Sequence, residues 1–214
     1  MNDTAGNKLP VCVISRLRMD TDGEGVTTLV ITSGCPLRCK YCINPYTWNG
    51  EAKKIRSYSA SELFEALRVD NLYFLSTGGG IVFGGGEPLL HSEFLKEFIT
   101  EYRHLGWKFS VETSLNVPFE NLERVYELFD GFIVDTKDCN KERYEAYTSG
   151  NYDRFYNNLS FLINHASPQK ITVRVPRIYD FHTGDEAAEN AAFLRRMGFI
   201  NIDIFSYVDP KTRN

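Results

Sequence analysis

The sequence lacks the features that mark membrane, secreted and nucleic-acid-binding proteins. Its 214 residues contain no apolar run long enough to cross a bilayer, and the polar segment 1–10 holds no signal-peptide core. The formal net charge of −4 provides no basic excess for a nucleic acid or an anionic membrane. We therefore expect a cytoplasmic protein with no membrane and no nucleic-acid partner.

Cysteine and histidine are scarce, and repeats are missing. Five cysteines, an odd number, argue against a disulfide framework. With no repeat, low-complexity segment or linker, residues 11–214 are expected to form one domain behind a flexible tail of residues 1–10. The four histidines follow no metal-ligand spacing and are expected on the solvated surface: His91, His104, His165 and His182.

What the sequence does contain is three cysteines within eight residues. The segment GCPLRCKYC places Cys35, Cys39 and Cys42 at C-x3-C-x2-C spacing. Structural zinc takes four protein ligands, whereas three thiolates on a 4Fe–4S cluster leave one iron open for a substrate or cofactor. The alternatives are a zinc half-site completed by a distant His or Cys, and three buried structural cysteines. Cys12 and Cys139 are expected to be inert.

Predicted strands and helices alternate along the chain. Ser59 caps a helix, 70–77 is predicted as a connector, and further helices are predicted at 92–104, 119–129, 185–197 and, as one or two, within 140–165. Such alternation implies a parallel sheet covered by helices. Since a full eight-unit barrel needs ~250 residues, we expect an α/β fold, a partial (β/α)6 TIM-like barrel. The predicted strands are 27–32, 81–83, 108–112, 132–134, 171–175 and 202–205.

Polar residues follow the predicted strands at the ends where parallel barrels carry their reactive groups. For the glycine run the structural alternative is a tight turn, and for the charged residues it is an exposed strand end or an internal ion pair. The cysteine loop comes after the first strand, and the later strands are followed by or contain Gly85, Gly86, Glu87, Glu112, Thr113, Asp135, Lys137 and Arg174.

The cysteine spacing, with Tyr41 before the last cysteine, resembles the radical S-adenosylmethionine (SAM) superfamily. The flanking segments MDTDGEGVTT at 19–28 and NPYTW at 44–48 resemble the glycyl-radical-enzyme activases of the pyruvate formate-lyase activating enzyme type. The likeness runs from about residue 16 to 207. It implies a radical SAM oxidoreductase fed with electrons by flavodoxin or ferredoxin. Reductive cleavage of SAM at a 4Fe–4S cluster would yield a 5′-deoxyadenosyl radical that takes hydrogen from a backbone glycine of a partner glycyl-radical enzyme.

The resemblance also implies a role for each matching residue. Cys35, Cys39 and Cys42 would ligate the cluster and so be catalytic through it. Asp22 would contact the glycine loop of the partner. Glu112 and Thr113 stand where activases carry Asp-Thr, a pair that helps to bind SAM and, in some members, a monovalent cation. The residues expected to bind SAM are Tyr41, Gly85, Gly86, Glu87, Glu112, Thr113, Asp135, Lys137 and Arg174.

The sequence departs from the activases at positions that would face the substrate. Ile43 stands where many activases have histidine, and Val208 falls where a histidine near the last strand would contact SAM. A radical SAM enzyme that acts on a small molecule or on another peptide is therefore an alternative. A non-catalytic iron–sulfur or zinc-binding module is an alternative of another class.

Overall fold

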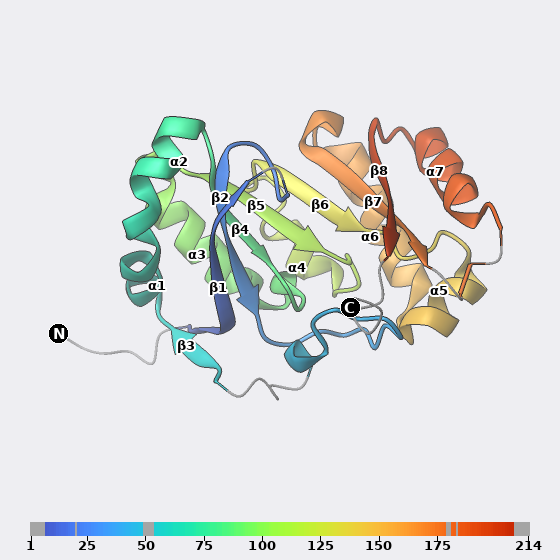
Figure 1. Ribbon diagram of the computed structural model, residues 1–214, viewed down its shortest axis with the longest axis horizontal. Coiled ribbons are helices and arrows are strands. Elements are labelled where there is room, and N and C mark those ends of the chain that lie inside the picture. Colours follow the sequence, from blue (N-terminus) through green and yellow to red (C-terminus); the bar gives the residue numbers. More distant parts are fainter. Residues whose placement is uncertain (1–6, 20, 49–53, 179–180, 183, 208–214) are drawn as a thin grey trace, which may run out of the picture.

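The computed structural model describes residues 7–19, 21–48, 54–178, 181–182 and 184–207 (Figure 1). The strands are β1 (Leu9–Met19), β2 (Val26–Thr32), β3 (Arg56–Tyr58), β4 (Gly80–Gly84), β5 (Lys108–Thr113), β6 (Gly131–Asp135), β7 (Ile171–Ile178) and β8 (Asn201–Tyr207). The α-helices are α1 (Ala60–Leu67), α2 (Asn71–Thr77), α3 (Ser92–Tyr102), α4 (Phe119–Glu123), α5 (Lys141–Thr148), α6 (Tyr152–His165) and α7 (Glu186–Met197). Short 3-10 helices lie at Pro45–Thr47, Arg68–Asp70, Pro88–His91, Arg103–Leu105 and Pro168–Lys170.

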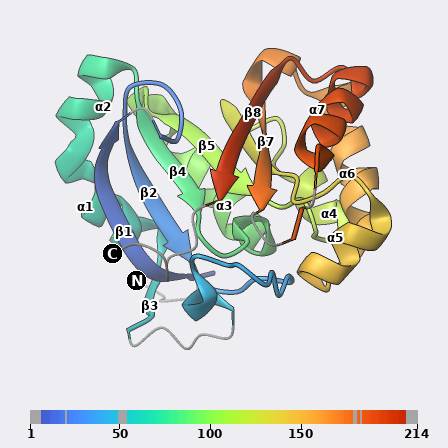
Figure 2. The same ribbon diagram turned by 45° about the vertical axis from the view of Figure 1, so that its right-hand side comes forward.

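The strands of the described residues belong to one eight-stranded sheet in the order β3-β1-β2-β4-β5-β6-β7-β8. Each pair from β2–β4 to β7–β8 is parallel, whereas β1 runs antiparallel to both β2 and β3. Figures 1 and 2 show a curved sheet with the helices along its outer side, from α1 and α2 at one end to α7 at the other. The six parallel strands confirm the predicted partial (β/α)6 barrel.

The strand residues alternate between a helix-covered core and the inner face of the sheet. In β5, Phe109 and Val111 are fully buried in the core, so Glu112 points to the opposite face. In β7 the same alternation buries Val173 and Val175 and turns Arg174 inward. The period of two thus places ionisable groups inside the barrel while apolar residues hold its wall.

The element boundaries correct three expectations and decide a fourth, which left open whether one helix or two would form. Strand β1 begins at Leu9, which is fully buried and pairs with Tyr58, so residues 9 and 10 belong to the sheet and not to the tail expected over 1–10. Residues 1–6 lie outside the described ones. The predicted connector 70–77 contains helix α2, with Phe74 in the core. Helix α4 ends at Glu123 instead of continuing to residue 129. The segment 140–165 forms two helices, separated at Ser149 with φ of 55°.

Two further sequence expectations have a structural outcome. The capping box at the start of α1 is confirmed: Ser59 Oγ accepts from Glu62 N at 3.2 Å, and the Glu62 carboxylate accepts from Ser59 N at 2.8 Å. In the described ranges, no helix is long and apolar enough to cross a membrane.

Candidate active site

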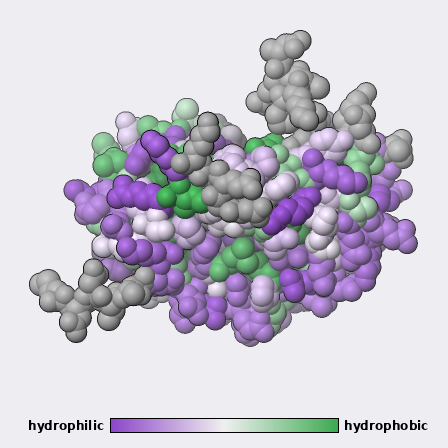
Figure 3. All heavy atoms as spheres, turned by 90° about the horizontal axis from the view of Figure 1, so that it is seen from below, coloured by the Kyte–Doolittle hydropathy of each residue, from purple (hydrophilic) through white to green (hydrophobic). Residues whose placement is uncertain are grey.

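A cavity of about 530 Å³ opens at the carboxyl ends of the parallel strands. Figure 3 looks at the molecule from this side and shows apolar atoms beside strongly polar ones. Every parallel strand, or the loop after it, contributes to the lining. Of the site residues predicted from the sequence, only Glu87 is absent from the cavity wall; those that line it are Asp22, Cys35, Cys39, Tyr41, Cys42, Gly85, Gly86, Glu112, Thr113, Asp135, Lys137 and Arg174.

The cysteine loop, residues 34–42, is fixed mainly by backbone hydrogen bonds from both sides. Gly34 N donates to Thr47 O at 2.7 Å. Arg38 N donates to Thr148 O at 2.7 Å, and Lys40 N donates to Tyr147 O at 3.1 Å. The end of α5 therefore holds the middle of the loop. Because these bonds satisfy backbone groups, they set the loop's path without depending on flexible side chains.

The glycines after β4 bring a second backbone against the start of this loop. Glu87 N donates to Gly34 O at 2.7 Å. A Cβ added to Gly86 would lie 2.4 Å from that same carbonyl oxygen. Gly85 has a φ of 89°, and a Cβ there would lie 2.3 Å from Ile31 Cγ2. Both positions therefore need glycine, one for close approach and the other for its backbone conformation as well.

The three thiols of the loop line one wall of the cavity and are not in disulfides. Burial raises the pKa of Cys35 to about 12, with the Glu87 charge adding to the effect. Burial also raises the pKa of Cys39, which Lys137 opposes. In the part of the chain that is described, no three His, Cys, Asp or Glu side chains converge closely enough to hold a single metal ion.

This donor set fits a 4Fe–4S cluster. Each thiolate of such a cluster binds a different iron, so the three sulfurs need not meet at one point. The cavity they line is large enough to extend beyond them, toward the ionisable groups of the later strands. Metal binding deprotonates thiols even where burial disfavours the free thiolate.

Lys137 stands beside the thiols in an uncommon backbone conformation, with a φ of 58°. Its Nζ donates to Asp135 Oδ2 at 3.2 Å. Burial disfavours the charged ammonium, but the charges of Asp135 and Cys39 outweigh it and raise the pKa of Lys137 well above its ordinary value. The lysine therefore keeps a positive charge against the cysteine loop. Strained residues of this kind cluster at functional sites.

Opposite charges form a second region of the lining, the charged wall of Arg18, Asp22, Glu112 and Arg174. Arg174 Nη1 donates to Glu112 Oε1 at 2.9 Å, and its Nη2 donates to Thr21 O at 2.6 Å. Asp22 is 2% exposed and accepts from Arg18. Each buried charge in this wall thus has at least one partner of opposite sign.

The Glu112 carboxyl is the most perturbed member of the charged wall. Burial and the nearby Asp135 charge raise its pKa to about 7, although Arg174 pulls it down. The pairing with Arg174 is the internal ion pair that the sequence left open as an alternative. Glu112 already has a cationic partner in the Arg174 guanidinium. The monovalent cation expected beside Glu112 stays a prediction.

Glu87 does not line the cavity and is fully buried. Its Oε1 accepts from Thr113 Oγ1 at 2.7 Å, and its Oε2 accepts from Ser114 N at 2.9 Å and from Ser114 Oγ at 2.6 Å. Leu89 N donates to Oε1 at 3.3 Å. Burial raises the pKa of Glu87, and these hydrogen bonds oppose the increase. The side chain therefore ties the loop after β4 to the loop after β5, and only backbone of this segment faces the cavity.

The cavity also contains residues that the sequence did not single out. Tyr147, near the end of α5, stacks on Tyr41 with ring centroids 6.4 Å apart. Asp203 lines the wall from β8, two residues before Phe205. Alternation along β8 was a usable signal for both, because side chains two apart share a face. Nothing in the sequence indicated Tyr147 or Arg18, since neither follows a parallel strand.

Comparison with known proteins identifies similar sequences and folds. The profile of the Radical SAM superfamily matches residues 29–204. The 4-hydroxyphenylacetate decarboxylase activating enzyme of Clostridioides difficile (strain 630) is 24% identical over 247 residues, covering 87% of this chain and 78% of that protein. The pyruvate formate-lyase-activating enzyme of Clostridium pasteurianum is 35% identical over 127 residues, covering 59% of this chain and 52% of that protein.

Among solved structures, SuiB of Streptococcus suis bound to S-adenosylmethionine aligns with a TM-score of 0.63 at 13% identity. The alignment covers 83% of this chain and 39% of SuiB, or about two fifths of that protein. The match to the Clostridium pasteurianum enzyme covers about half of that enzyme. At 13% identity the likeness to SuiB concerns the fold alone.

Proposed function

The chain belongs to the radical SAM superfamily, whose members use a 4Fe–4S cluster and SAM, and we propose that it activates a glycyl-radical enzyme. The observation that carries the proposal is the shared cavity: three thiols of one loop line the same space as the paired charges of the charged wall. The two activating enzymes described above support the choice of substrate, because activation of another enzyme is their named role.

The residues of the chain supply binding, orientation and exclusion of water. Cys35, Cys39 and Cys42 would hold the cluster by three irons. When bound and reduced, the cluster would supply the electron for cleavage of SAM to methionine and a 5′-deoxyadenosyl radical, which would remove hydrogen. No side chain needs to act as a general acid or base in this chemistry.

The SAM site would use both regions of the lining. Backbone groups at Gly85 and Gly86 suit the amino group of SAM, because no side chain stands between them and the cavity. Arg174 suits its carboxylate, since the guanidinium fork matches that shape. Tyr41, in the wall of the cavity, would cover the adenine. Lys137, Asp135, Glu112 and Thr113 complete the polar lining around the ligand.

The partner would present a backbone glycine to the cavity, whose wall includes Asp22. Flavodoxin or ferredoxin is the proposed electron donor, and the proposal includes a cytoplasmic reaction under anaerobic conditions. The exposed Ile43, 63% accessible at the rim, takes the place of a polar residue and would meet the incoming loop.

The test uses protein reconstituted anaerobically with iron and sulfide. With SAM and a reductant it should form 5′-deoxyadenosine. Added to a candidate glycyl-radical enzyme, such as one encoded by a neighbouring gene, it should generate an EPR doublet on that enzyme. Product without a doublet would favour a small-molecule or peptide substrate instead. Absence of product from a cluster-loaded preparation would contradict any radical SAM activity and favour a binding module.

A further inference from the structure

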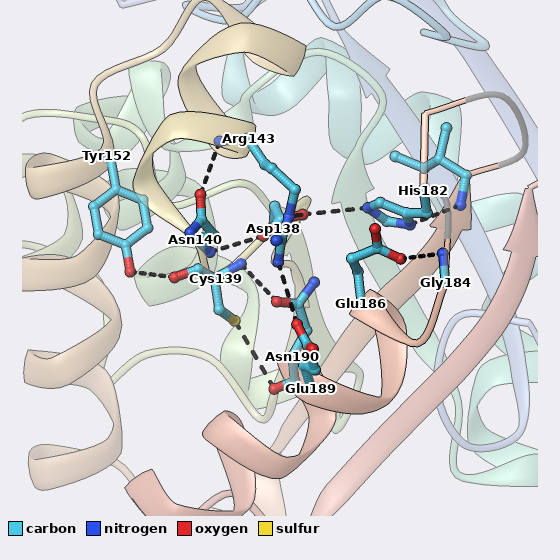
Figure 4. A network of polar contacts seen from close by, with 11 residues as sticks. Asp138, Cys139, Asn140, Arg143, Tyr152, His182, Gly184, Glu186, Glu189 and Asn190 are labelled. Carbon is cyan, nitrogen blue, oxygen red and sulfur yellow. Dashed lines mark hydrogen bonds and ion pairs between the residues drawn. The ribbon is translucent and has the colours of Figure 1, made fainter.

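Behind the cavity lies a buried polar network centred on Asp138, shown in Figure 4. The Asp138 side chain is 1% exposed and that of His182 is 2% exposed, which contradicts the expectation of a solvated histidine. Asp138 Oδ2 accepts from Arg143 Nε at 2.9 Å and from His182 Nε2 at 3.2 Å. Asp138 Oδ1 accepts from Asn140 N at 2.7 Å. One carboxylate therefore joins the start of α5 to the segment after β7.

The imidazole of His182 has a defined tautomer because both its nitrogens have partners. Ile178 N donates to Nδ1 at 3.1 Å, so Nδ1 carries no proton in this arrangement. The proton is consequently on Nε2, which donates to Asp138. Removing the ring would leave the Ile178 N–H and one oxygen of Asp138 without this partner in a buried place.

The network connects to the cysteine loop through aromatic packing. Phe181, next to His182, packs against the Tyr147 ring with centroids 5.1 Å apart. Phe181 and Tyr147 belong to the same apolar cluster as Cys39 and Leu37 of the loop. The Lys40 Nζ also lies 5.5 Å from the Phe181 ring centre. The segment that His182 anchors thus forms one support of the loop.

The same carboxylate supports the loop by a second route. Arg143 anchors α5 on Asp138, and the end of α5 provides the backbone carbonyls of Tyr147 and Thr148 that accept from the loop. Asp138 also directly follows Lys137, whose left-handed conformation brings its ammonium to the thiols. Three supports of the loop therefore depend on the buried Asp138: the segment held by His182, the end of α5 held by Arg143, and the adjacent Lys137.

We propose that Asp138 and His182 form a positioning clasp that holds the cysteine loop in the shape required to retain the cluster. The inference rests on the proposed cofactor site. Neither residue lines the cavity, so neither would touch the cluster or SAM. Residues that orient metal ligands from behind are worth about tenfold or more in metal affinity.

The test compares three substitutions of His182 in the reconstituted full chain. The readout is the concentration of the ferrous chelator bathophenanthroline disulfonate that removes half of the cluster iron. His182→Ala should lower this concentration about tenfold. His182→Gln keeps a donor for Asp138 and should retain wild-type resistance. His182→Asn keeps an acceptor for Ile178 N, but its shorter side chain puts no donor at the position from which Nε2 bonds to Asp138, so it should behave like His182→Ala. Wild-type resistance in His182→Ala, or rescue by Asn instead of Gln, would overturn the clasp.

A matched control separates this effect from loss of fold stability. Asp70 is also buried, at 4% exposure, and bonds to Arg16 and Thr28 near the other end of β2. Asp70→Asn should lower the thermal midpoint without changing chelator resistance. If Asp70→Asn loses iron as readily as His182→Ala at the same thermal midpoint, the network is merely structural and the proposal fails.

A second measurement does not depend on the cluster or on the partner enzyme. In the cluster-free full chain, Cys39 is buried at 7% exposure. His182→Ala should speed alkylation of Cys39 by iodoacetamide, followed by mass spectrometry, and leave the rate at Cys12 unchanged. An unchanged Cys39 rate would contradict the clasp even if the glycyl-radical activity were established. A missing glycyl radical would contradict only the proposed function.

Discussion

The cysteine loop and the charged wall line the same cavity, but different forces hold them. The loop is held by hydrogen bonds that its backbone N–H groups donate to the carbonyls of Thr47, Tyr147 and Thr148, and by the close approach of Gly86. The charged wall is held by side chains, chiefly the pairs of Arg174 with Glu112 and of Arg18 with Asp22. Backbone contacts fix one geometry, whereas ion pairs can exchange partners.

This difference matches what each region is proposed to bind. A cluster stays on the protein through many turnovers, so its ligands gain from a loop with one conformation. SAM arrives and leaves as products, so its charged groups need side chains that can pair with each other in its absence. Damage to the loop should therefore remove the cluster, and damage to the wall should weaken SAM while the cluster stays.

The largest expected effect is loss of a cluster thiolate. Cys39→Ala removes one of three iron ligands and should abolish both bound iron and 5′-deoxyadenosine formation. Iron analysis and chromatographic detection of the nucleoside measure the two quantities. Cys12→Ala is the matched control, because Cys12 packs against Leu29 and Ile31 and does not line the cavity. Equal activity of the two variants would contradict the thiolate assignment.

The next effect concerns the close approach of the two backbones. Gly86→Ala places a methyl group 2.4 Å from Gly34 O and 2.7 Å from Thr32 O, and neither backbone atom can move freely. We expect the free energy of unfolding, measured in urea, to fall by about 3 kcal/mol, and the content of cluster iron to fall sharply. In Gly184→Ala the new methyl meets only Glu186 Oε2, at 3.8 Å, so stability should change little. Normal iron content in Gly86→Ala would contradict a rigid loop.

The third effect is a pH dependence of the charged wall. With a pKa raised from 4.5 to about 7, Glu112 keeps its proton in the folded protein at pH values where the unfolded chain releases it. Its contribution to stability is therefore complete below pH 4.5 and declines as the pH rises through 7. The free energy of unfolding of wild type minus that of Glu112→Gln should fall by about 3 kcal/mol over this range in urea titrations.

Two outcomes delimit this prediction. Glu112→Asp keeps a titratable carboxyl and should retain the downward slope relative to Glu112→Gln. A difference that stays flat or increases with pH would show that burial does not dominate at Glu112.

The smallest effect is a partial loss of SAM affinity. Arg174→Lys keeps the positive charge but loses the fork that bonds Glu112 and Thr21 O together. SAM affinity, measured by equilibrium dialysis, should fall about tenfold, with the iron content unchanged. Arg68→Lys, at a pair more than half exposed, is the control and should bind SAM normally. Loss of iron with intact SAM affinity would contradict the proposal that the charged wall binds SAM and the cysteine loop alone holds the cluster.

The sequence was informative about the parts that follow a local pattern. Alternating strands such as β5 and β7 predicted the parallel sheet, and their carboxyl ends predicted where Glu112 and Arg174 meet. Helix α2 was missed because its apolar residues Leu72 and Leu75 are exposed, so no buried stripe marked it as helical. Periodicity identifies an element only when burial follows the period.

Contacts between distant segments could not be predicted from the sequence. His182 and Asp138 are 44 positions apart, and no spacing rule relates them. The Glu87 side chain was expected at the ligand, but its partners Thr113 and Ser114 come from the next strand end. Only the packing of the two loops shows that its carboxylate is already used within the protein.

The most direct test of the account is the EPR spectrum of the reduced cluster before and after addition of SAM. We expect a 4Fe–4S signal from anaerobically reconstituted protein, and a change in that signal when SAM binds the open iron. A preparation without a cluster signal, or with one that SAM leaves unchanged, would contradict the account of the cavity.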